Sequence, residues 1–438
     1  MNANTTQHKI QFTLQKVAIA WMFALLTVNF PYVAAVELGI PLVLVGVMLG
    51  LYPFWGPFQP FFGRFTQSHP ILGYYRTPYL LLGFFVGGII FPFVPTLTQQ
   101  ISAGSSVAVL ALFLLFFIFG IAIALMANTF LDLLSDVTTD ETRSNVTATA
   151  WTGQTLAIAL WAFVFRQMMP TYSLEAMTRL YTITPFVVMG IGLLSVVGLE
   201  PRGRKLDAYQ SNESALSESF QLLTGNRMAR RFFLFIALSL LAIFLQDILQ
   251  EPLGGELFGM SIGQTTNFQI IFNASVAIGM TIAAIVGTIR LGDENRQLSM
   301  DAKKRIATTG GLGTMAGFML LALSVFASSP LFFQTALFLN GLCVGVFTFG
   351  SITMMAGMTV PGKTGKYLGV WSLGQVVGLG LSFMIAGLLH SLFIGSGLFA
   401  PAVGYGLIFL IEAGVMGWCV WSLQPADAVE LRRQAVPA

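Results

Sequence analysis

The chain has 438 residues, of which 55% are hydrophobic and only 9% are charged, whereas about a quarter of an ordinary soluble domain is charged. Its apolar residues form many long runs along the whole length, which excludes both a soluble fold and a single membrane anchor. A net charge of +3 without a basic patch excludes a nucleic-acid partner. Cys343 and Cys419 both lie in apolar runs, so we expect no disulfide and no metal site.

Twelve apolar runs are long enough to cross a membrane. A hydrocarbon core about 30 Å thick requires about 20 apolar residues in a helix, and charges, Pro and Gly separate the runs. The predicted spans are 14–36, 40–62, 77–97, 105–131, 146–168, 180–199, 231–250, 264–289, 306–327, 331–357, 367–391 and 400–423. With the amino terminus in the cytoplasm, all Lys and Arg except Arg166 and Arg179 fall on the cytoplasmic side. Both termini are therefore expected there.

A polar stretch divides the twelve spans into two halves. Residues 200–230 read as a cytoplasmic linker between an N-terminal six-helix bundle, 1–199, and a C-terminal one, 231–438, with a short cytoplasmic tail. Glu37 resembles Glu256 and Trp151 resembles Trp371 at nearly equal spacing, which indicates a duplicated unit, with chance similarity as the alternative. The predicted fold class is an all-α membrane protein of two six-helix bundles around a central cavity, like the major facilitator superfamily.

The loop after the second span carries part of a facilitator gate motif. In GRFTQSHPILGYYR, Gly63 and Arg76 match the glycine and a basic residue usual in facilitators, but Gln67 replaces the usual acid. A cytoplasmic gate built on that acid is therefore expected to be weak, leaving Arg76 to cap or pair with acids of the next cytoplasmic loop. In that loop, DLLSDVTTDETRSN, the acids either cap the following helix or, through Asp136 pairing with Arg76 or Arg143, latch one conformation.

The outer end of the seventh span carries the most unusual polar residues. Asp247, Gln250 and Glu251 are spaced to share one helical face, and Pro252 with the following glycines is expected to end the helix. A charge at bilayer depth costs about 2.5–3.5 kcal/mol, so this face should meet a cavity or outer water, unless it merely lies at the headgroup level. If the acids are buried together, the pKa of at least one rises, which suits proton coupling.

Other polar residues extend this picture. Glu37, at the outer end of the first span, is expected to border the same external mouth, so the predicted outer cluster comprises Glu37, Gln246, Asp247, Gln250, Glu251 and Glu256. The predicted polar residues of the cavity are Asn29, Asn128 and Asn340. The alternative for these, and for Gln154, Gln375 and Glu412, is hydrogen bonding between helices.

Aromatic residues make up 13% of the chain, with 39 Phe, so any cavity should be apolar and suit a lipid-like, pigment or protein-helix client. His8, His69 and His390 all lie away from the middle of a span, and we expect no permanently bound tetrapyrrole ligated by His. A tetrapyrrole that is bound transiently through Gln, Asn, main chain or water remains an alternative.

Five stretches together resemble the PucC and LhaA family, the bacteriochlorophyll-delivery branch of the major facilitators. They are VELGIP, HPILGYYRTPY, FLDLLSDVTTDETR with AWTGQ, QDILQEPLGGELFGMSIGQTT and YLGVWSLGQ. The resemblance covers essentially the whole chain, and Gln67 departs from the family's usual acid.

The resemblance implies a photosynthetic assembly factor that binds or delivers (bacterio)chlorophyll or antenna apoproteins. It implies transient chlorophyll or bacteriochlorophyll as the ligand, light-harvesting antenna subunits or pigment-synthesis proteins as partners, and a bacterial inner, intracytoplasmic or thylakoid membrane. No nucleotide loop or acidic metal motif is visible, so we expect no enzyme. The alternatives are a proton-coupled transporter of an amphipathic small molecule, in which Asp247, Glu251 or Glu37 titrates, and a scaffold with an inert cavity.

Overall fold

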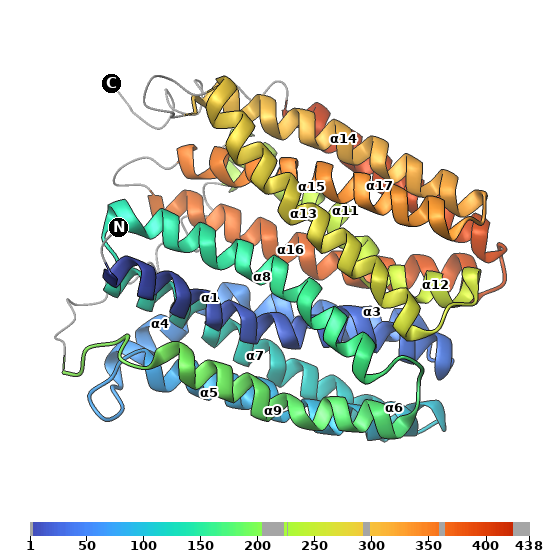
Figure 1. Cartoon of the computed structure of the whole chain (residues 1–438), viewed down its shortest axis with the longest axis horizontal. Helices are drawn as coiled ribbons and strands as arrows, with labels where there is room; N and C mark the ends of the chain where they lie inside the picture. The colour runs from blue at the N-terminus through green and yellow to red at the C-terminus, as the bar shows by residue number, and fades with distance from the viewer. Residues whose placement is uncertain (1–2, 204–222, 226, 292–297, 359–363, 424–438) are drawn as a thin grey trace. The chain divides into compact units, whose positions relative to one another are not determined.

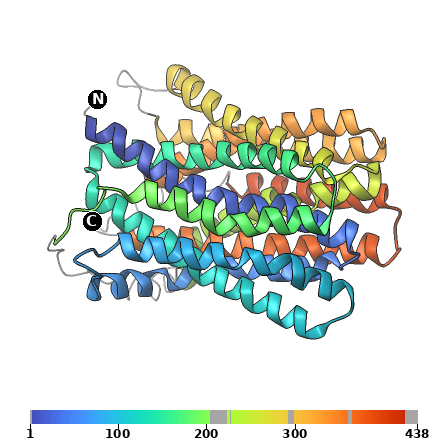
Figure 2. The ribbon, with the colours of Figure 1, turned by 60° about the horizontal axis from the view of Figure 1, so that its bottom comes forward.

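The computed structural model describes residues 3–203, 223–225, 227–291, 298–358 and 364–423. Within these ranges the elements are helices, and an isolated bridge joins Ile71 and Tyr74 (Figures 1 and 2). Eleven helices are long and apolar enough to cross a membrane, or twelve if one bent pair counts as a single span. The predicted all-α fold class is thereby confirmed.

The first compact unit consists of residues Met1–Ser211 and Met260–Asn267. Its elements are α1 (Ala3–Ala24), η1 (Leu25–Asn29), α2 (Phe30–Tyr32), η2 (Val33–Glu37), α3 (Leu42–Leu51), η3 (Tyr52–Phe58), α4 (Gln59–Ser68), α5 (Thr77–Ile89), η4 (Phe91–Phe93), α6 (Val94–Ser102), α7 (Ser106–Val137), α8 (Asp140–Met168) and α9 (Leu174–Val196). Helix α1 packs against α8 and α9, and α5 packs against α7 and α9.

Prolines distort the first two spans. Pro31 lacks the N–H that an α-helix needs, and the widened π turns η1 and η2 flank it within the span Thr6–Glu37. The second span is bent by 60° between Leu42–Phe58 and Phe61–Ser68, because Pro53 and Pro57 interrupt its hydrogen bonds. A single unbroken helix over 40–62 is therefore not what the structure shows.

The second compact unit consists of residues Asn212–Gly259 and Phe268–Ala438. Its elements are α11 (Arg227–Leu245), η5 (Gln246–Ile248), α12 (Gln250–Phe258), most of α13 (Ile262–Leu291), α14 (Met300–Phe326), α15 (Pro330–Met358), α16 (Thr364–His390), η6 (Ser391–Gly395) and α17 (Pro401–Leu423). Helix α14 packs against α15 and α17, while α11 packs against α16 and α17. Glycines permit these close approaches, since a Cβ on Gly378 of α16 would overlap the main chain of α11.

The unit boundaries differ in one respect from a plain division at the linker. Residues Met260–Asn267 belong to the first unit, where the Gly263 N–H donates to the Pro170 carbonyl at 3.1 Å. Arg166 likewise donates through Nη1 to Asn267 Oδ1 at 2.7 Å. Residues 204–222 of the expected linker and the side chain of Trp371 lie outside the described residues.

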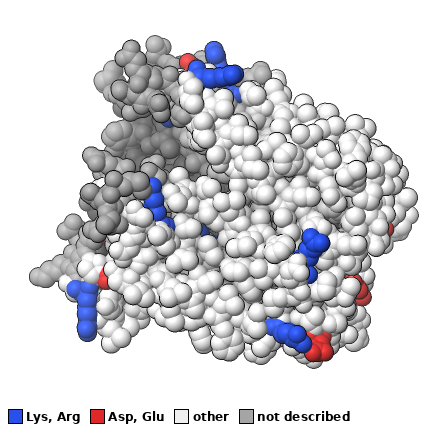
Figure 3. Space-filling model, viewed as in Figure 1, with Lys and Arg blue, Asp and Glu red and all other residues white. Residues whose placement is uncertain are grey.

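The surface suits a lipid environment. On the face seen in Figure 3, the charged side chains lie toward the two ends of the helices, and the wide area between them is uncharged. Large apolar side chains such as Val107, Phe186 and Leu331 are exposed. The chain is an integral membrane protein, because such a surface is stable in lipid and unfavourable in water.

Candidate functional site

The seventh span breaks at the residues singled out in the sequence. Helix α11 ends at Leu245, a 3-10 turn follows, and α12 begins at Gln250. Pro252 is the third residue of α12, where its missing N–H is not needed. The prediction that Pro252 and the glycines after it end the helix is therefore wrong. The break precedes the proline, and α12 ends at Gly259, whose φ is +63°.

Four polar residues lie around this break, and a fifth lies on the last helix, α17, which packs against α12. We call Gln246, Asp247, Gln250, Glu251 and Glu412 the acid–amide cluster. Gln246, Gln250 and Glu251 are fully buried, Glu412 of α17 is 1% exposed, and only Asp247 is partly exposed. Glu251 is therefore enclosed within its unit, and the expectation that this face meets a cavity or outer water stays a prediction.

Most polar atoms of the acid–amide cluster lack partners. Among the described residues, neither carboxylate oxygen of Glu412 and neither amide atom of Gln250 has a hydrogen-bond partner, while Glu251 has only its own main chain and the Gln269 amide as polar neighbours. The Gln246 amide nitrogen donates weakly to the Ile243 carbonyl at 3.3 Å, while its oxygen has no described partner. Buried polar groups are nearly always satisfied in folded proteins, so this cluster has the chemistry of a site for protons or a polar ligand group.

Glu251, which lies just beyond the span Ala229–Ile248, is favoured in its neutral form. Burial raises the pKa of its carboxyl well above the usual value, and the charge of Asp247 raises it further. The main chain of Glu251 and the nearby Gln269 amide lower this pKa only in part. A protonated Glu251 is a hydrogen-bond donor held in apolar surroundings.

Glu256 makes contacts that the sequence did not predict. Its carboxylate lies 3.0 Å from His390 Nε2 and accepts a hydrogen bond of 2.9 Å from the Tyr405 hydroxyl. Glu256 therefore ties α12 to α16 and α17 and does not join the acid–amide cluster. Glu37 belongs to the other unit, and its place beside the predicted external mouth stays a prediction.

The asparagines predicted to line the cavity are buried and bonded within their own units. Asn29 Oδ1 accepts a hydrogen bond from the Tyr181 hydroxyl at 3.2 Å, and Asn340 Nδ2 donates to the Thr314 carbonyl at 3.2 Å. Both hydrogen bonds join neighbouring helices, as expected if these asparagines serve helix packing and do not line a cavity. Asn128 instead donates to Asp132 Oδ2 on its own helix at 2.8 Å.

Arg76 holds the centre of a buried network in the first unit. Its Nη1 lies 3.0 Å from Asp132 Oδ2 and its Nε lies 3.3 Å from Asp136 Oδ2. Nη1 also donates to Thr66 Oγ1 at 2.7 Å and, more weakly, to the Gly63 carbonyl at 3.4 Å. The expected pairing of Arg76 with acids of the next cytoplasmic loop is present, through both Asp132 and Asp136.

Arg143 and the residues before α8 act as caps. Arg143 Nη2 lies 3.5 Å from the Ser135 carbonyl and 3.4 Å from the Thr138 carbonyl, near the end of α7. Thr139 and Thr142 form a capping box at the start of α8. Both the latch contact and the cap therefore occur, because different residues of the same loop provide them.

The carboxylate of Glu200 caps the start of α5. Its oxygens accept hydrogen bonds of 2.6 Å from the Tyr75 N–H, 3.0 Å from Arg76 N–H and 2.6 Å from Thr77 N–H. A carboxylate at this position satisfies main-chain donors and favours the positive end of the helix. Glu200, which was not predicted from the sequence, is the residue that caps this helix.

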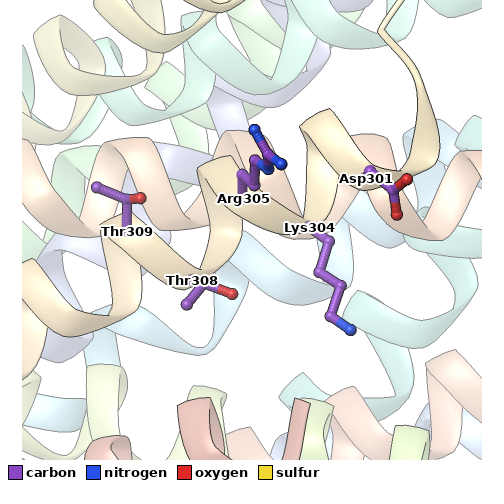
Figure 4. A pocket seen from close by; sticks show the side chains of 5 residues that line it. All are labelled: Asp301, Lys304, Arg305, Thr308 and Thr309. Carbon is purple, nitrogen blue, oxygen red and sulfur yellow. The ribbon is translucent and has the colours of Figure 1, made fainter. Parts of the chain in front are cut away.

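A separate pocket of about 330 Å³ lies along the first turns of α14 (Figure 4). Its lining residues are Asp301, Lys304, Arg305, Thr308 and Thr309. All of them come from one face of one helix, and none belongs to the acid–amide cluster. This shallow surface feature is therefore not the candidate site.

Solved structures with this fold are membrane transporters. A mutant of the nucleoside transporter NupG superposes with a TM-score of 0.70 at 13% identity, covering 97% of this chain and 100% of that one. At this identity the likeness shows the fold alone, and the class is an integral membrane protein with the major facilitator fold.

The family follows from the sequence match. The model of the PUCC protein family matches residues 31–426, and the chain belongs to this family. Three relatives come from Rhodobacter capsulatus. An uncharacterized protein of the puhA–bchM intergenic region is 27% identical, covering 93% of this chain and 86% of the relative. Protein PucC is 24% identical, covering 93% of this chain and 89% of the relative. The bacteriochlorophyll synthase 44.5 kDa chain is 25% identical, covering 91% and 90%.

Proposed function

We propose that this protein is an assembly factor for photosynthetic light-harvesting complexes, which binds or delivers (bacterio)chlorophyll, antenna apoproteins or both. The observation that carries the proposal is the family match over residues 31–426, which spans both units. A relative named as a bacteriochlorophyll synthase chain supports the link to pigment. The partners would be antenna subunits or pigment-synthesis proteins, and the proposal assigns no catalytic activity to the chain itself.

The acid–amide cluster supplies suitable chemistry for a pigment. (Bacterio)chlorophyll is a large apolar ring system with keto and ester carbonyl groups at its edge. A neutral Glu251 carboxyl and the Gln250 amide can donate hydrogen bonds to such carbonyls, and an amide oxygen can approach the central magnesium. Within an apolar bundle, a few polar groups of this kind orient a ligand that is otherwise held by hydrophobic contact.

The test is genetic and spectroscopic. Deletion of the gene in a phototrophic host should lower the antenna absorption of isolated membranes relative to that of the reaction centre, and the wild-type gene should restore it. Gln250→Leu should restore it poorly, whereas Gln100→Leu, at an exposed position, should restore it fully. Normal antenna levels in the deletion strain would contradict the proposal.

A second candidate is a proton-coupled transporter of an amphipathic small molecule. The observation that favours it is the burial of the Glu251 and Glu412 carboxyls inside the second unit, since such carboxyls can bind and release protons. Flux into proteoliposomes that requires a pH gradient and is lost in Glu251→Gln would support it. Flux that is independent of both acids would exclude these residues as the coupling groups.

We also propose that both termini are cytoplasmic, in a bacterial inner, intracytoplasmic or thylakoid membrane. The basis is the charge bias of the loops. Cysteines introduced at Arg202 and Lys303 should react with an impermeant reagent from the same side. Labelling from opposite sides would contradict this topology.

A further inference from the structure

Lys16 is a buried cation enclosed by aromatic rings. It lies on α1 in the first unit and is 6% exposed. Its Nζ lies 3.8 Å from the centroid of the Trp151 ring and 4.6 Å from that of the Phe130 ring. No ion pair joins Lys16 to an Asp or Glu in the part of the chain that the structure describes.

Close packing of two helices places the ring of Trp151 over this lysine. Thr13 of α1 lies against Gly153 of α8, where any Cβ would overlap the Thr13 methyl group. Helix α8 therefore approaches α1 closely, and Trp151, two residues before Gly153, covers the Lys16 side chain. Trp151 is also 44% exposed, so part of its ring remains accessible to another molecule.

Polar atoms without partners lie on the same two helices. Gln15, which precedes Lys16, is fully buried, and neither its amide nitrogen nor its amide oxygen has a partner among the described residues. Gln154 lies one turn after Trp151 on α8, and its buried amide oxygen also has no hydrogen-bond partner among the described residues. Purely structural polar residues in a bundle normally bond across helices, as Asn29 does.

The charge of Lys16 calls for a counter-ion. A buried ammonium group is costly in apolar surroundings, and contact with aromatic faces offsets only part of that cost. An anionic group would neutralise it and accept hydrogen bonds from the ammonium group. An exposed indole offers a stacking surface for a flat apolar body.

We propose that Lys16 and Trp151 form a site for a flat amphipathic ligand with a free carboxylate, in which Lys16 binds the carboxylate and Trp151 stacks on the ring system. Resting on the proposed function, this narrows the ligand to a tetrapyrrole acid, such as a pigment whose propionate is not esterified. The site lies within the first unit and is separate from the acid–amide cluster of the second unit.

The test compares an acid with its ester on the full-length protein in nanodiscs. Chlorophyllide a and its methyl ester serve as probes, and binding is measured by quenching of tryptophan fluorescence and by pigment absorption. Wild type should bind the acid about tenfold more tightly than the ester, which corresponds to about 1.4 kcal/mol. Lys16→Gln should abolish this preference and Lys16→Arg should keep it. Trp151→Leu should weaken both probes.

Lys9→Gln is the matched control, because it removes one positive charge from the same helix outside the site, and it should leave the preference unchanged. Equal binding of acid and ester to wild type, or an unchanged preference in Lys16→Gln, would overturn the site while leaving pigment binding intact. If neither pigment binds but oleate binds through Lys16, the tetrapyrrole ligand and the proposed pigment function both fail.

Discussion

Replacing Arg76 by Met should destabilise the first unit strongly. The Arg76 side chain is 5% exposed and contacts Asp132 at 3.0 Å, Asp136 at 3.3 Å and Thr66 at 2.7 Å. Removing one partner of a buried ion pair costs about 3–5 kcal/mol, because a charge stays buried without compensation. The side chains of the two carboxylates are 20% and 22% exposed and can regain water, so we expect the lower end, about 3 kcal/mol.

Thermal unfolding of the purified protein in detergent measures this effect. For a unit of this size, about 3 kcal/mol corresponds to a fall in Tm of roughly 6–12 °C. Arg179→Met is the control, since its pair with Glu175 has side chains 70% and 84% exposed and should change Tm hardly at all. Adding Asp136→Asn to Arg76→Met should recover part of the loss. Equal Tm values for the Arg76 and Arg179 variants would refute the reasoning.

Three further substitutions have defined outcomes. The pKa of Glu251 is raised in the folded state, so wild-type Tm should fall as pH rises from about 4.3 toward that higher pKa, and Glu251→Gln should flatten the fall in a pH series. Gly279→Ala would push a Cβ into the main chain of α15 and should lower the free energy of unfolding by about 1–3 kcal/mol. Gly190→Ala is the control, because open space surrounds that position, and it should be neutral or stabilising. Tyr181→Phe should cost about 1 kcal/mol by the same measurement, because it removes the hydrogen bond to Asn29.

The membrane spans could be predicted because run length alone determines them. The predicted span 146–168 coincides with Val146–Met168 in the structure. The bend in the second span could not be predicted in the same way. Hydropathy measures how much apolar surface a segment has, and it does not show whether Pro53 and Pro57 bend the helix or are absorbed within it.

The candidate site was only partly predictable. Gln250 and Glu251 could be found because their helical spacing is local. Glu412 was visible as an acid in an apolar run, but nothing in the sequence places it beside α12, since that contact depends on how α17 packs. His390 beside Glu256 was missed for the same reason. The sequence showed no sign of a ligand site at Lys16, because a basic residue near the start of a first span is usual on the cytoplasmic side.

The carboxylate that closes the start of α5 has a consequence for biogenesis. Glu200 lies 123 residues after Thr77, and its carboxylate accepts a hydrogen bond from the Thr77 N–H. At about 5–20 residues per second, the ribosome adds this residue roughly 6–25 s after Thr77. Until then the first turn of that helix has no acid to bind its free N–H groups. The cap can therefore form only after the sixth span has been made.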